Sequence, residues 1–574
     1  MSDTIDRSAD ISQPLEKLGP DETLKVNSDY LRGTINESLL NRITGSVTFE
    51  DNKLMKFHGI YQQDDRDIRD ERRRQKLEPA YTFMIRVRLP GGVCTPEQWL
   101  RIDELARAHG GNTIRLTTRQ TFQFHWVVKE DVRATIQGLH DVLLDTIAAC
   151  GDDARGVMAT SDPRDSALHA EVAALSKRLS DHVIPRTRAY HEIWYGEERL
   201  ATSTEEEPFY GKQYLPRKFK IGFAVPPSND IDIYTQDLGF IAITAPDGNL
   251  EGFNVSIGGG MGRNDSDPDT FARLADVIGF IPKDKLEIAA DAVMGTQRDF
   301  GNRKHRPRAR FKYTVHDKGV EWVKGEVERR MGFPFGPVRS YEFDSNGDIY
   351  GWRENDNGRF NHTVFVQSGR VSNFGDRRVM DGLRAIAQVH KGSFRLTPNQ
   401  NLIIADVASE DRPAIEALLA EHGLGSSEQI SAMRKNSIAC VALPTCVLAM
   451  AEAERYMPDF ASKLEEILAA NGLLDEPITV RISGCPNGCS RPYVAEIALT
   501  GRAPGKYNLW LGAGFHGERL NTLYRENIGE AAILEILDEM LGRYARERNA
   551  GEHFGDFVHR AGYLGDTQPA ATGA

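Results

Sequence analysis

The sequence contains no apolar run long enough to cross a membrane. Its most apolar stretch, residues 438–451, contains a proline and two cysteines. It falls short of the roughly 18 apolar residues that a spanning helix needs. The first residues are rich in acidic side chains and lack the apolar core of a signal peptide. We therefore expect a cytoplasmic protein with no membrane contact.

Cysteine and positive charge are also scarce. Of the 574 residues 6 are cysteine, and Asp plus Glu (83) exceed Lys plus Arg (71), which gives a net charge of −12. Few cysteines argue against a disulfide-stabilised fold, and the acidic balance argues against a nucleic-acid binder. Apolar residues make up 40% and charged residues 27% of the chain, which is typical of globular proteins and excludes a disordered one.

Local patterns predict a strand followed by a helix early in the chain. Residues 83–89 alternate in the manner of a strand. Thr95 suits the N-cap of a helix, Pro96 suits its first position, and Gln98 completes a capping box. The glycine pair 110–111 is expected to end this helix.

Residues 114–126 predict a bent strand with one apolar and one polar face. Successive side chains of an extended chain point to opposite sides. Arg115, Arg119 and Gln123 share the side opposite the apolar residues. Polar residues interrupt the apolar side in the middle of the segment, so we expect a bend near Arg119.

The chain contains an internal repeat. Residues 395–400 match residues 115–120 at Arg, Leu, Thr and Gln, and residues 506–514 are a weaker echo of residues 252–260. The two echoes keep the same order, which indicates two related halves with a boundary around 335–355. The first copy has an arginine where the second has an asparagine, so we expect one working site.

Basic residues recur at a spacing of two, and on strands each set would share one face. Like charges side by side are unfavourable unless an anion lies opposite them. The alternative is a set of solvated sheet edges, but the sets recur in a net acidic chain, so we favour a polyanionic ligand. Outside residues 114–126 the sets are Arg86 with Arg88, Arg217 with Lys218 and Lys220, and Arg306 with Arg308, Arg310 and Lys312.

Four of the cysteines form a quartet with the pattern C-x5-C, a gap of 38 residues, then C-x3-C. We expect two helices, at about 446–456 and 460–470, and a strand at 478–482 to fold back and bring both pairs together. The first of these helices would begin at a cysteine, where the helix dipole favours a thiolate. The quartet consists of Cys440, Cys446, Cys485 and Cys489.

Four cysteines can hold zinc or an iron–sulfur cluster. Zinc sites favour short polar knuckles, whereas this quartet lies in apolar sequence. Cys485 is followed by a proline and an Asn-Gly turn that can aim backbone N–H groups at sulfur. From these residues we favour a [4Fe–4S] cluster, with structural zinc and unligated core thiols as the alternatives. Cys94 and Cys150 are expected to be ordinary buried cysteines.

Taken together, these motifs resemble a known family. The quartet, the Arg-Leu-Thr-Thr-Arg-Gln-Thr-Phe-Gln-Phe-His run at 115–125, the Leu-Pro-Arg-Lys-Phe-Lys run at 215–220 and Tyr-Asn-Leu-x-Leu-Gly at 507–512 are similar to those of siroheme nitrite and sulfite reductases. The similarity is greatest to the haemoprotein subunits of assimilatory sulfite reductases, and it extends from residues 27–35 to 551–557.

The resemblance implies the six-electron reduction of sulfite to sulfide in sulfate assimilation and cysteine biosynthesis. It also implies a [4Fe–4S] cluster on the four cysteines and a siroheme whose iron shares the Cys489 thiolate. The carboxylates of siroheme would be the polyanion that the basic sets require. Implied siroheme contacts are Arg115, Arg119, Gln123, Arg217, Arg310 and Asn487, and implied substrate contacts are Arg86, Arg155, Lys218 and Lys220.

The implied fold is α+β, with a pseudo-twofold duplication. The expected divisions are an N-terminal arm at 1–78 that could dock a partner, ferredoxin-like units at 79–148 and 346–427, and larger α/β cofactor-binding units at 149–345 and 428–574.

The electrons are expected to come from a partner protein. Residues 258–262 are glycine-rich but lack the third glycine of a dinucleotide-binding motif. The resemblance implies a flavoprotein subunit that carries FAD and FMN and oxidises NADPH, in a hetero-oligomer. The alternatives are a ferredoxin donor, a nitrite reductase, and a non-catalytic zinc or cluster module that binds anionic partners.

Overall fold

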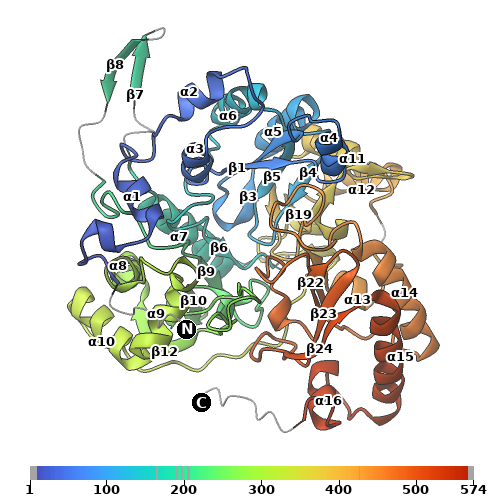
Figure 1. The fold of residues 1–574 in the computed structure, drawn as a ribbon. Helices are drawn as coiled ribbons and strands as arrows, with labels where there is room; N and C mark the ends of the chain where they lie inside the picture. Colours follow the sequence, from blue (N-terminus) through green and yellow to red (C-terminus); the bar gives the residue numbers. More distant parts are fainter. Residues whose placement is uncertain are drawn as a thin grey trace.

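The structure is a computed structural model and describes residues 9–162, 164, 166–187, 192–195, 198–202, 207–425 and 427–565. It is an α+β fold made of two similar halves, which lie side by side in Figure 1, the first coloured blue to green and the second yellow to red. Each half combines two five-stranded sheets, a smaller one with mostly short strands and a larger one with longer strands. Within the described residues no helix is long and apolar enough to span a membrane.

The smaller sheets are antiparallel, and each is completed by a short strand from the other half. This exchange joins the two halves through main-chain hydrogen bonds. The first sheet runs in the order β1 (Ile60–Asp64), β2 (Tyr81–Arg86), β5 (Phe122–Val127), β4 (Ile114–Leu116) and β15 (Arg370–Val371). The second runs in the order β13 (Gly351–Glu354), β14 (Phe360–Val364), β19 (Leu402–Val407), β18 (Ser393–Leu396) and β3 (Val93–Cys94).

The helices of the smaller units share one apolar core with both smaller sheets. The predicted helix is confirmed as α5 (Pro96–His109), where the Thr95 side chain and Gln98 form the expected capping box. The predicted strand and bent strand are confirmed as β2 and as β4 with β5. The other helices are α6 (Val132–His140), α11 (Val379–Val389) and α12 (Arg412–Glu421).

The larger sheets share one pattern of parallel and antiparallel pairing. The first runs in the order β12 (Asp276–Pro282), β11 (Leu250–Ile257), β10 (Leu238–Thr244), β9 (Ile221–Ala224) and β6 (Met158–Ala159). The second runs in the order β20 (Ser437–Ala439), β21 (Val480–Ser483), β22 (Ile497–Ala503), β23 (Lys506–Leu511) and β24 (Thr522–Ile528). Both echoes of the sequence thus fall on equivalent strands.

Helices flank each larger sheet. The first half contains α7 (Ala167–Val183), α8 (Leu286–Phe300), α9 (Phe311–Lys318) and α10 (Val320–Met331). The second contains α13 (Ala432–Lys435), α14 (Met457–Ala470), α15 (Glu530–Glu547) and α16 (Phe554–Arg560). Helix α14 confirms the second helix predicted between the cysteine pairs.

The repeated Arg-Leu-Thr motifs form equivalent turns, one between β4 and β5 and one between β18 and β19. Gln120 and Gln400 both adopt a left-handed backbone in these turns, with φ of 53° and 70°. The Gln120 carboxamide bonds both main-chain groups of Ala159, and Gln400 does the same with Ala439. Each turn therefore joins the smaller sheet of its half to the larger one.

The N-terminal arm packs against the first half. It contains α1 (Pro20–Val26), α2 (Ile35–Leu40), α3 (Phe49–Leu54) and α4 (Arg69–Arg74), and it contributes β1. Glu22 of α1 is buried between Lys25 and Arg303, so the arm is held by internal ion pairs. Its use in partner docking stays a prediction, and residues 1–8 lie outside the described part of the chain.

The prediction of a helix at 446–456 was wrong. These residues form a loop, in which the amides of Met450 and Ala451 both donate to the carbonyl of Gly484. Those amides therefore cannot donate to the carbonyls one helical turn earlier, as they would in a helix. The segment instead runs as a loop across the ends of the strands.

The basic residues of 306–312 do not lie on a strand, so they do not share one face as they would in one. The segment forms a short 3-10 helix, η7 (Arg306–Arg308), and then enters α9. Pro307 has no N–H group to donate to a neighbouring strand. The basic side chains therefore point to separate partners, among them Asp152 for Arg306 and Asp317 for Arg308.

Candidate functional site

The four cysteines lie together near the carboxyl ends of two neighbouring strands. Cys440 directly follows β20, and Cys485 and Cys489 lie in the turn after β21, which pairs with β20 in parallel. Cys446 comes from the loop after β20. The amide of Gly484 donates to Cys440 Sγ at 3.2 Å. The fold thus gathers the predicted quartet into one site of the second half.

The thiols act on one another electrostatically. Burial raises the pKa of Cys440 well above its ordinary value, and the charges of Cys489 and Cys485 raise it further. Burial and Cys489 together raise the pKa of Cys485 to about 12, and they also raise that of Cys446. Such thiols remain protonated unless a positively charged metal centre stabilises the thiolates.

Hydrogen-bond donors lie around the cysteine sulfurs. The side-chain amide of Asn487 donates to Cys485 Sγ at 3.5 Å, and the main-chain groups of Leu448 and Ala449 lower the pKa of Cys446. Donors of this kind stabilise cluster thiolates.

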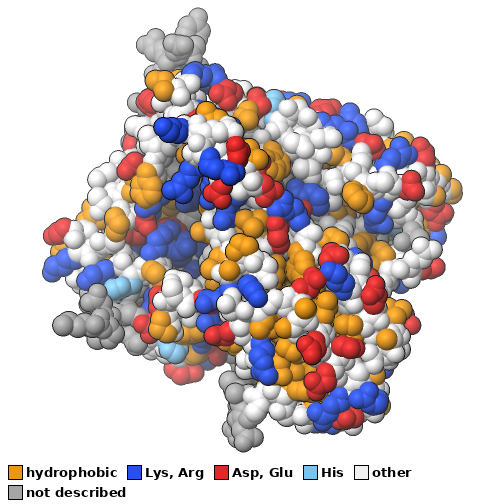
Figure 2. Space-filling model, turned by 45° about the vertical axis from the view of Figure 1, so that its right-hand side comes forward, with side chains coloured by type: hydrophobic (Ala, Val, Ile, Leu, Met, Phe, Trp, Pro, Cys, Tyr) orange, Lys and Arg blue, Asp and Glu red, His pale blue; other side chains and the backbone are white. Residues whose placement is uncertain are grey.

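The predicted basic residues gather beside the quartet. Burial lowers the pKa of Lys218 well below its ordinary value, Arg310, Arg217 and Arg155 lower it further, and the Cys489 thiolate opposes them. The cations and the cysteines are therefore close enough for their charges to interact. Lys and Arg side chains also gather on the left and in the middle of the face drawn in Figure 2, although the chain is acidic as a whole.

The cations lower one another's pKa values. Burial lowers the pKa of Lys220 well below its ordinary value, and Arg119 and Lys218 lower it further. Burial, followed by Arg155, lowers the pKa of Arg119 to about 9, and burial, followed by Arg306, lowers that of Arg217 to about 10. Burying cations together is costly unless anions lie among them. This group of buried cations therefore fits a ring that carries carboxylates, as siroheme does.

Main-chain carbonyls and carboxylates orient several of these cations. Arg119 donates to Gly156 O at 2.7 Å and to Gln236 Oε1 at 2.9 Å. Arg310 donates to both oxygens of Asp237, at 2.8 and 3.0 Å, and Asp237 also accepts from the Lys220 amide. Asp237 was missed by the sequence analysis, because an isolated aspartate carries no signal in its spacing.

Arg86, Gln123 and Cys150 form one group. With its oxygen turned toward Arg86, the Gln123 carboxamide accepts two hydrogen bonds from that guanidinium. Arg86 also donates to Cys150 Sγ at 2.8 Å. Cys150 is thus buried, as predicted, but it touches a predicted substrate residue. Arg88 in contrast is not part of this group, because Asp145 and Asp181 form ion pairs with its guanidinium.

Arg115 extends from the first half to the cysteine quartet of the second half. Its guanidinium bonds Glu454 and donates to the carbonyl of Ala439, the residue before Cys440, at 2.6 Å. Burial lowers the pKa of Arg115 to about 10, although Glu454 opposes this. Arg155 lies in the first half, and its Nε and Nη2 donate to Gly151 O at 3.1 and 3.0 Å.

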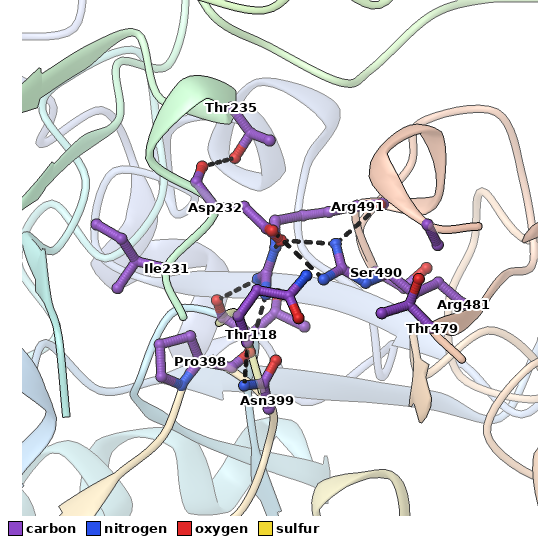
Figure 3. Close-up of polar contacts among 12 residues, drawn as sticks. Thr118, Ile231, Asp232, Thr235, Pro398, Asn399, Thr479, Arg481, Ser490 and Arg491 are labelled. Atoms are coloured by element: carbon purple, nitrogen blue, oxygen red, sulfur yellow. Dashed lines mark hydrogen bonds and ion pairs between the residues drawn. The ribbon is translucent and has the colours of Figure 1, made fainter. Parts of the chain in front are cut away.

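A buried ion-pair group joins the two halves beside the site. Asp232 of the first half accepts from Arg481 at 2.6 Å and from Arg491, both in the second half (Figure 3). Arg491 also donates to Thr118 O and Pro398 O, which lie in the two repeated turns. Asp232 and Arg491 are themselves equivalent, because each is the left-handed residue before a 3-10 helix, η5 (Ile233–Thr235) or η9 (Pro492–Val494).

The comparisons with known proteins identify the family. Residues 175–335 match the nitrite and sulphite reductase 4Fe-4S domain, and residues 74–142 and 353–422 match the nitrite/sulfite reductase ferredoxin-like half domain. The chain is 65% identical to the sulfite reductase (NADPH) hemoprotein beta-component of Methylocella silvestris and 67% identical to that of Nitrobacter hamburgensis, over 97% of both chains in each case. The chain belongs to this family of sulfite reductase hemoprotein beta-components.

Membership of this hemoprotein family confirms the fold and the pair of cofactors expected from the sequence. The two half-domain matches fall on the two smaller units. The NirA protein of Mycobacterium tuberculosis, 24% identical, has the same fold, with a TM-score of 0.77 over 96% of this chain and 97% of that one. The 4Fe-4S domain match lies in the first half, whereas the cysteines lie in the second. The ligand and contact residues named above therefore remain proposals.

Proposed function

We propose that this chain is the haem-bearing component of an assimilatory sulfite reductase, which reduces sulfite to sulfide. One observation carries the proposal: four mutually interacting thiols and a buried group of cations lie side by side where the two halves meet. The hemoprotein relatives, named as NADPH sulfite reductases, support the substrate. A cytoplasmic location belongs to the same proposal, because thiols stay reduced there.

The cysteines would hold the [4Fe–4S] cluster, with Cys489 shared with the siroheme iron, and Arg115, Arg119, Gln123, Arg217, Arg310 and Asn487 would contact siroheme. When bound, these groups supply electrons and a metal site for sulfur. The remaining task of the chain is to hold a dianion and to deliver protons. Arg86 and Arg155 would bind the sulfite oxygens, since guanidinium groups offer paired donors to oxyanions.

Lys218 and Lys220 would bind the same anion and supply protons. Sulfite, six electrons and seven protons give hydrogen sulfide anion and three waters, so each departing oxygen leaves as water. Because its charged form is destabilised by burial and by neighbouring cations, the Lys218 ammonium is a stronger acid than a free lysine. It is therefore suited to give a proton to a departing oxygen, and water can return the proton.

The electrons would come from a flavoprotein subunit that carries FAD and FMN and oxidises NADPH, in a hetero-oligomer, and a ferredoxin is the alternative donor. The loop after Cys446 offers a place for electron transfer, because Val447, Leu448 and Met450 are 49%, 61% and 40% exposed. Apolar side chains exposed beside a cluster ligand suit a transient protein contact.

The test is steady-state turnover with reduced methyl viologen, run in parallel on sulfite and nitrite. The artificial donor makes the partner unnecessary. We expect a clearly higher kcat/KM for sulfite. A preference for nitrite would move the chain to nitrite reduction, and absence of turnover in protein with a full iron content would contradict both activities.

A further inference from the structure

A cavity of about 80 Å³ lies between the N-terminal arm and the predicted substrate residues. Its wall includes Arg155 and Arg217, which the sequence analysis placed at the substrate and siroheme, and also Lys56, Tyr61 and Arg306. The half-exposed side chain of Arg306 (40%) shows that the cavity opens at the surface. Arg155, almost fully buried, marks the end nearest the predicted substrate site.

Positive charge dominates this cavity. In the described part of its wall, Lys25, Lys53, Lys56, Arg155, Arg217 and Arg306 stand against the carboxylates of Asp21 and Asp152. The carboxylates are fully occupied. Asp21 contacts Arg306 at 3.0 Å and Lys53, and Asp152 contacts Arg306 at 2.8 Å and Arg217 at 3.7 Å. An excess of cations therefore faces the cavity.

Lys56 differs from the other lysines of the cavity. Lys25 is paired with Glu22, and Lys53 with Asp21. The Lys56 ammonium makes no hydrogen bond or ion pair to any described residue, and its Nζ lies 5.7 Å from the centre of the Tyr61 ring. Burial lowers its pKa, Arg306 and Arg217 lower it further, and the nearby Asp152 carboxylate opposes them. A half-buried ammonium among arginines is unfavourable without an anion.

We propose that Lys56, which lies beside the paired guanidinium of Arg306, forms an outer anion site that collects the sulfite dianion from solvent and passes it to Arg155. The inference rests on the proposed function. At about 80 Å³ the cavity has room for only a few water molecules, so it suits a small oxoanion rather than a nucleotide. Clefts lined by one sign of charge raise the association rates of oppositely charged ligands.

The test compares Lys56→Gln with wild type and with Lys391→Gln, a matched change at an exposed lysine that pairs with Asp411 on the far ferredoxin-like unit. Sulfite association is followed in a stopped-flow instrument through the visible absorption of the holoenzyme. Turnover uses reduced methyl viologen. We expect Lys56→Gln to lower the association rate and kcat/KM for sulfite about tenfold at low ionic strength, with kcat unchanged.

Two features make the expected result specific. The loss should shrink as salt is added, because exposed charges are screened. It should also be smaller for nitrite, which carries one negative charge where sulfite carries two. Lys391→Gln should behave as wild type.

Three outcomes would overturn the inference. Unchanged association would show that Lys56 collects no anion, a fall in kcat at constant KM would place it in the chemistry, and a reduced siroheme content would make it a cofactor ligand. Failure of the proposed function looks different: wild type would then not reduce sulfite, while Lys56→Gln would still slow nitrite association.

Discussion

At the scale of single residues, the site is built from cations whose orientation is fixed before any ligand binds. Arg119 is held by Gly156 and Gln236, Arg155 by Gly151, and Arg310 by Asp237. Cations fixed in this way need little reorganisation when an anion arrives, which is the main source of electrostatic catalysis. Within the described residues, the ammonium groups of Lys218 and Lys220 have no such fixed partner, which suits proton delivery.

Lys218→Met tests the proton-donor role. Methionine keeps the length of the side chain but removes its charge and its protons, so we expect kcat for sulfite to fall by about 100-fold or more. Siroheme and iron content should stay at wild-type levels. Turnover with reduced methyl viologen measures the effect, and intact sulfite turnover would contradict the assigned role.

Residue spacing could predict part of this site. Arg115, Arg119 and Gln123 share a strand face, which alternation reveals. Arg155 and Asn487 entered through the resemblance, because no periodic pattern contains them. Asp237 and Cys150 were not predicted as parts of the site, since their contacts with Arg310 and Arg86 depend on how distant segments meet.

At the scale of secondary-structure elements, strand ends position the residues of the proposed site and short connections hold those strands. The carboxyl ends of β20 and β21 present the cysteines, and the repeated turns attach each smaller sheet to its larger sheet. Helices α15 and α16 and the loop between them pack at the end of the second half. There Glu496 accepts from the amides of Gly555 and Thr479, at 2.9 and 2.8 Å.

Glu496→Gln tests this last contact through its pH dependence. Burial raises the Glu496 pKa to about 7, although the two amides oppose it. The folded state therefore binds this proton more tightly than the unfolded state, and wild-type stability should fall between pH 4.5, the ordinary pKa of a glutamate, and about pH 7. Gln does not titrate, so the variant should not show this fall in stability. Its melting temperature relative to that of wild type should therefore rise from pH 4.5 to pH 7. An equal difference at pH 5 and pH 8 would contradict the assignment.

Leu448→Asp tests the loop beside Cys446 as the contact for the electron donor. A charge in an apolar contact weakens protein association, so we expect turnover with the flavoprotein and NADPH to fall severalfold. Turnover with methyl viologen should be unchanged. Leu143→Asp, at a residue that is 93% exposed on the first ferredoxin-like unit, is the control. Equal losses in both assays would mean that the loop supports the cluster rather than the partner.

Some elements could be predicted from local sequence and others could not. Helix α5 has its capping box and its terminal glycine within one short segment, so local rules suffice. The loop at 446–456 has a helix-like composition, but its amides are drawn to Gly484, which lies far along the chain. The basic run at 306–312 shows the spacing of a strand, yet Pro307 prevents sheet pairing. In both cases a feature outside the periodic pattern decided the structure.

At the scale of the whole molecule, the two halves are joined at their pseudo-twofold axis. The exchanged strands β3 and β15 complete the sheets of opposite halves. Beside the site, Asp232 and Arg491 occupy equivalent positions and bond each other directly. The repeat was visible in the sequence, whereas the exchange was not, because strands this short carry no pattern. The exchanged strands and the Asp232–Arg491 ion pair both hold the cysteines of one half against the cations of the other.

Asp232→Asn tests the junction. The change leaves Arg481 and Arg491 buried without a charged partner, so we expect a loss of about 3 kcal/mol or more. It should appear as a melting temperature several degrees lower, together with looser siroheme binding. Asp381→Asn, which removes the exposed pair with Arg107, should cost less than about 1 kcal/mol. Similar effects of the two changes would contradict a central role for the junction.

The most direct measurement of the central claim is the cofactor composition of the chain, purified without oxygen from a host that makes siroheme. The claim is that one chamber between the halves holds a siroheme next to a [4Fe–4S] cluster on Cys440, Cys446, Cys485 and Cys489. The account predicts one siroheme, five irons and four acid-labile sulfides per chain, and loss of both cofactors together in Cys440→Ser. A chain that carries zinc, or a cluster without tetrapyrrole absorption, would contradict it.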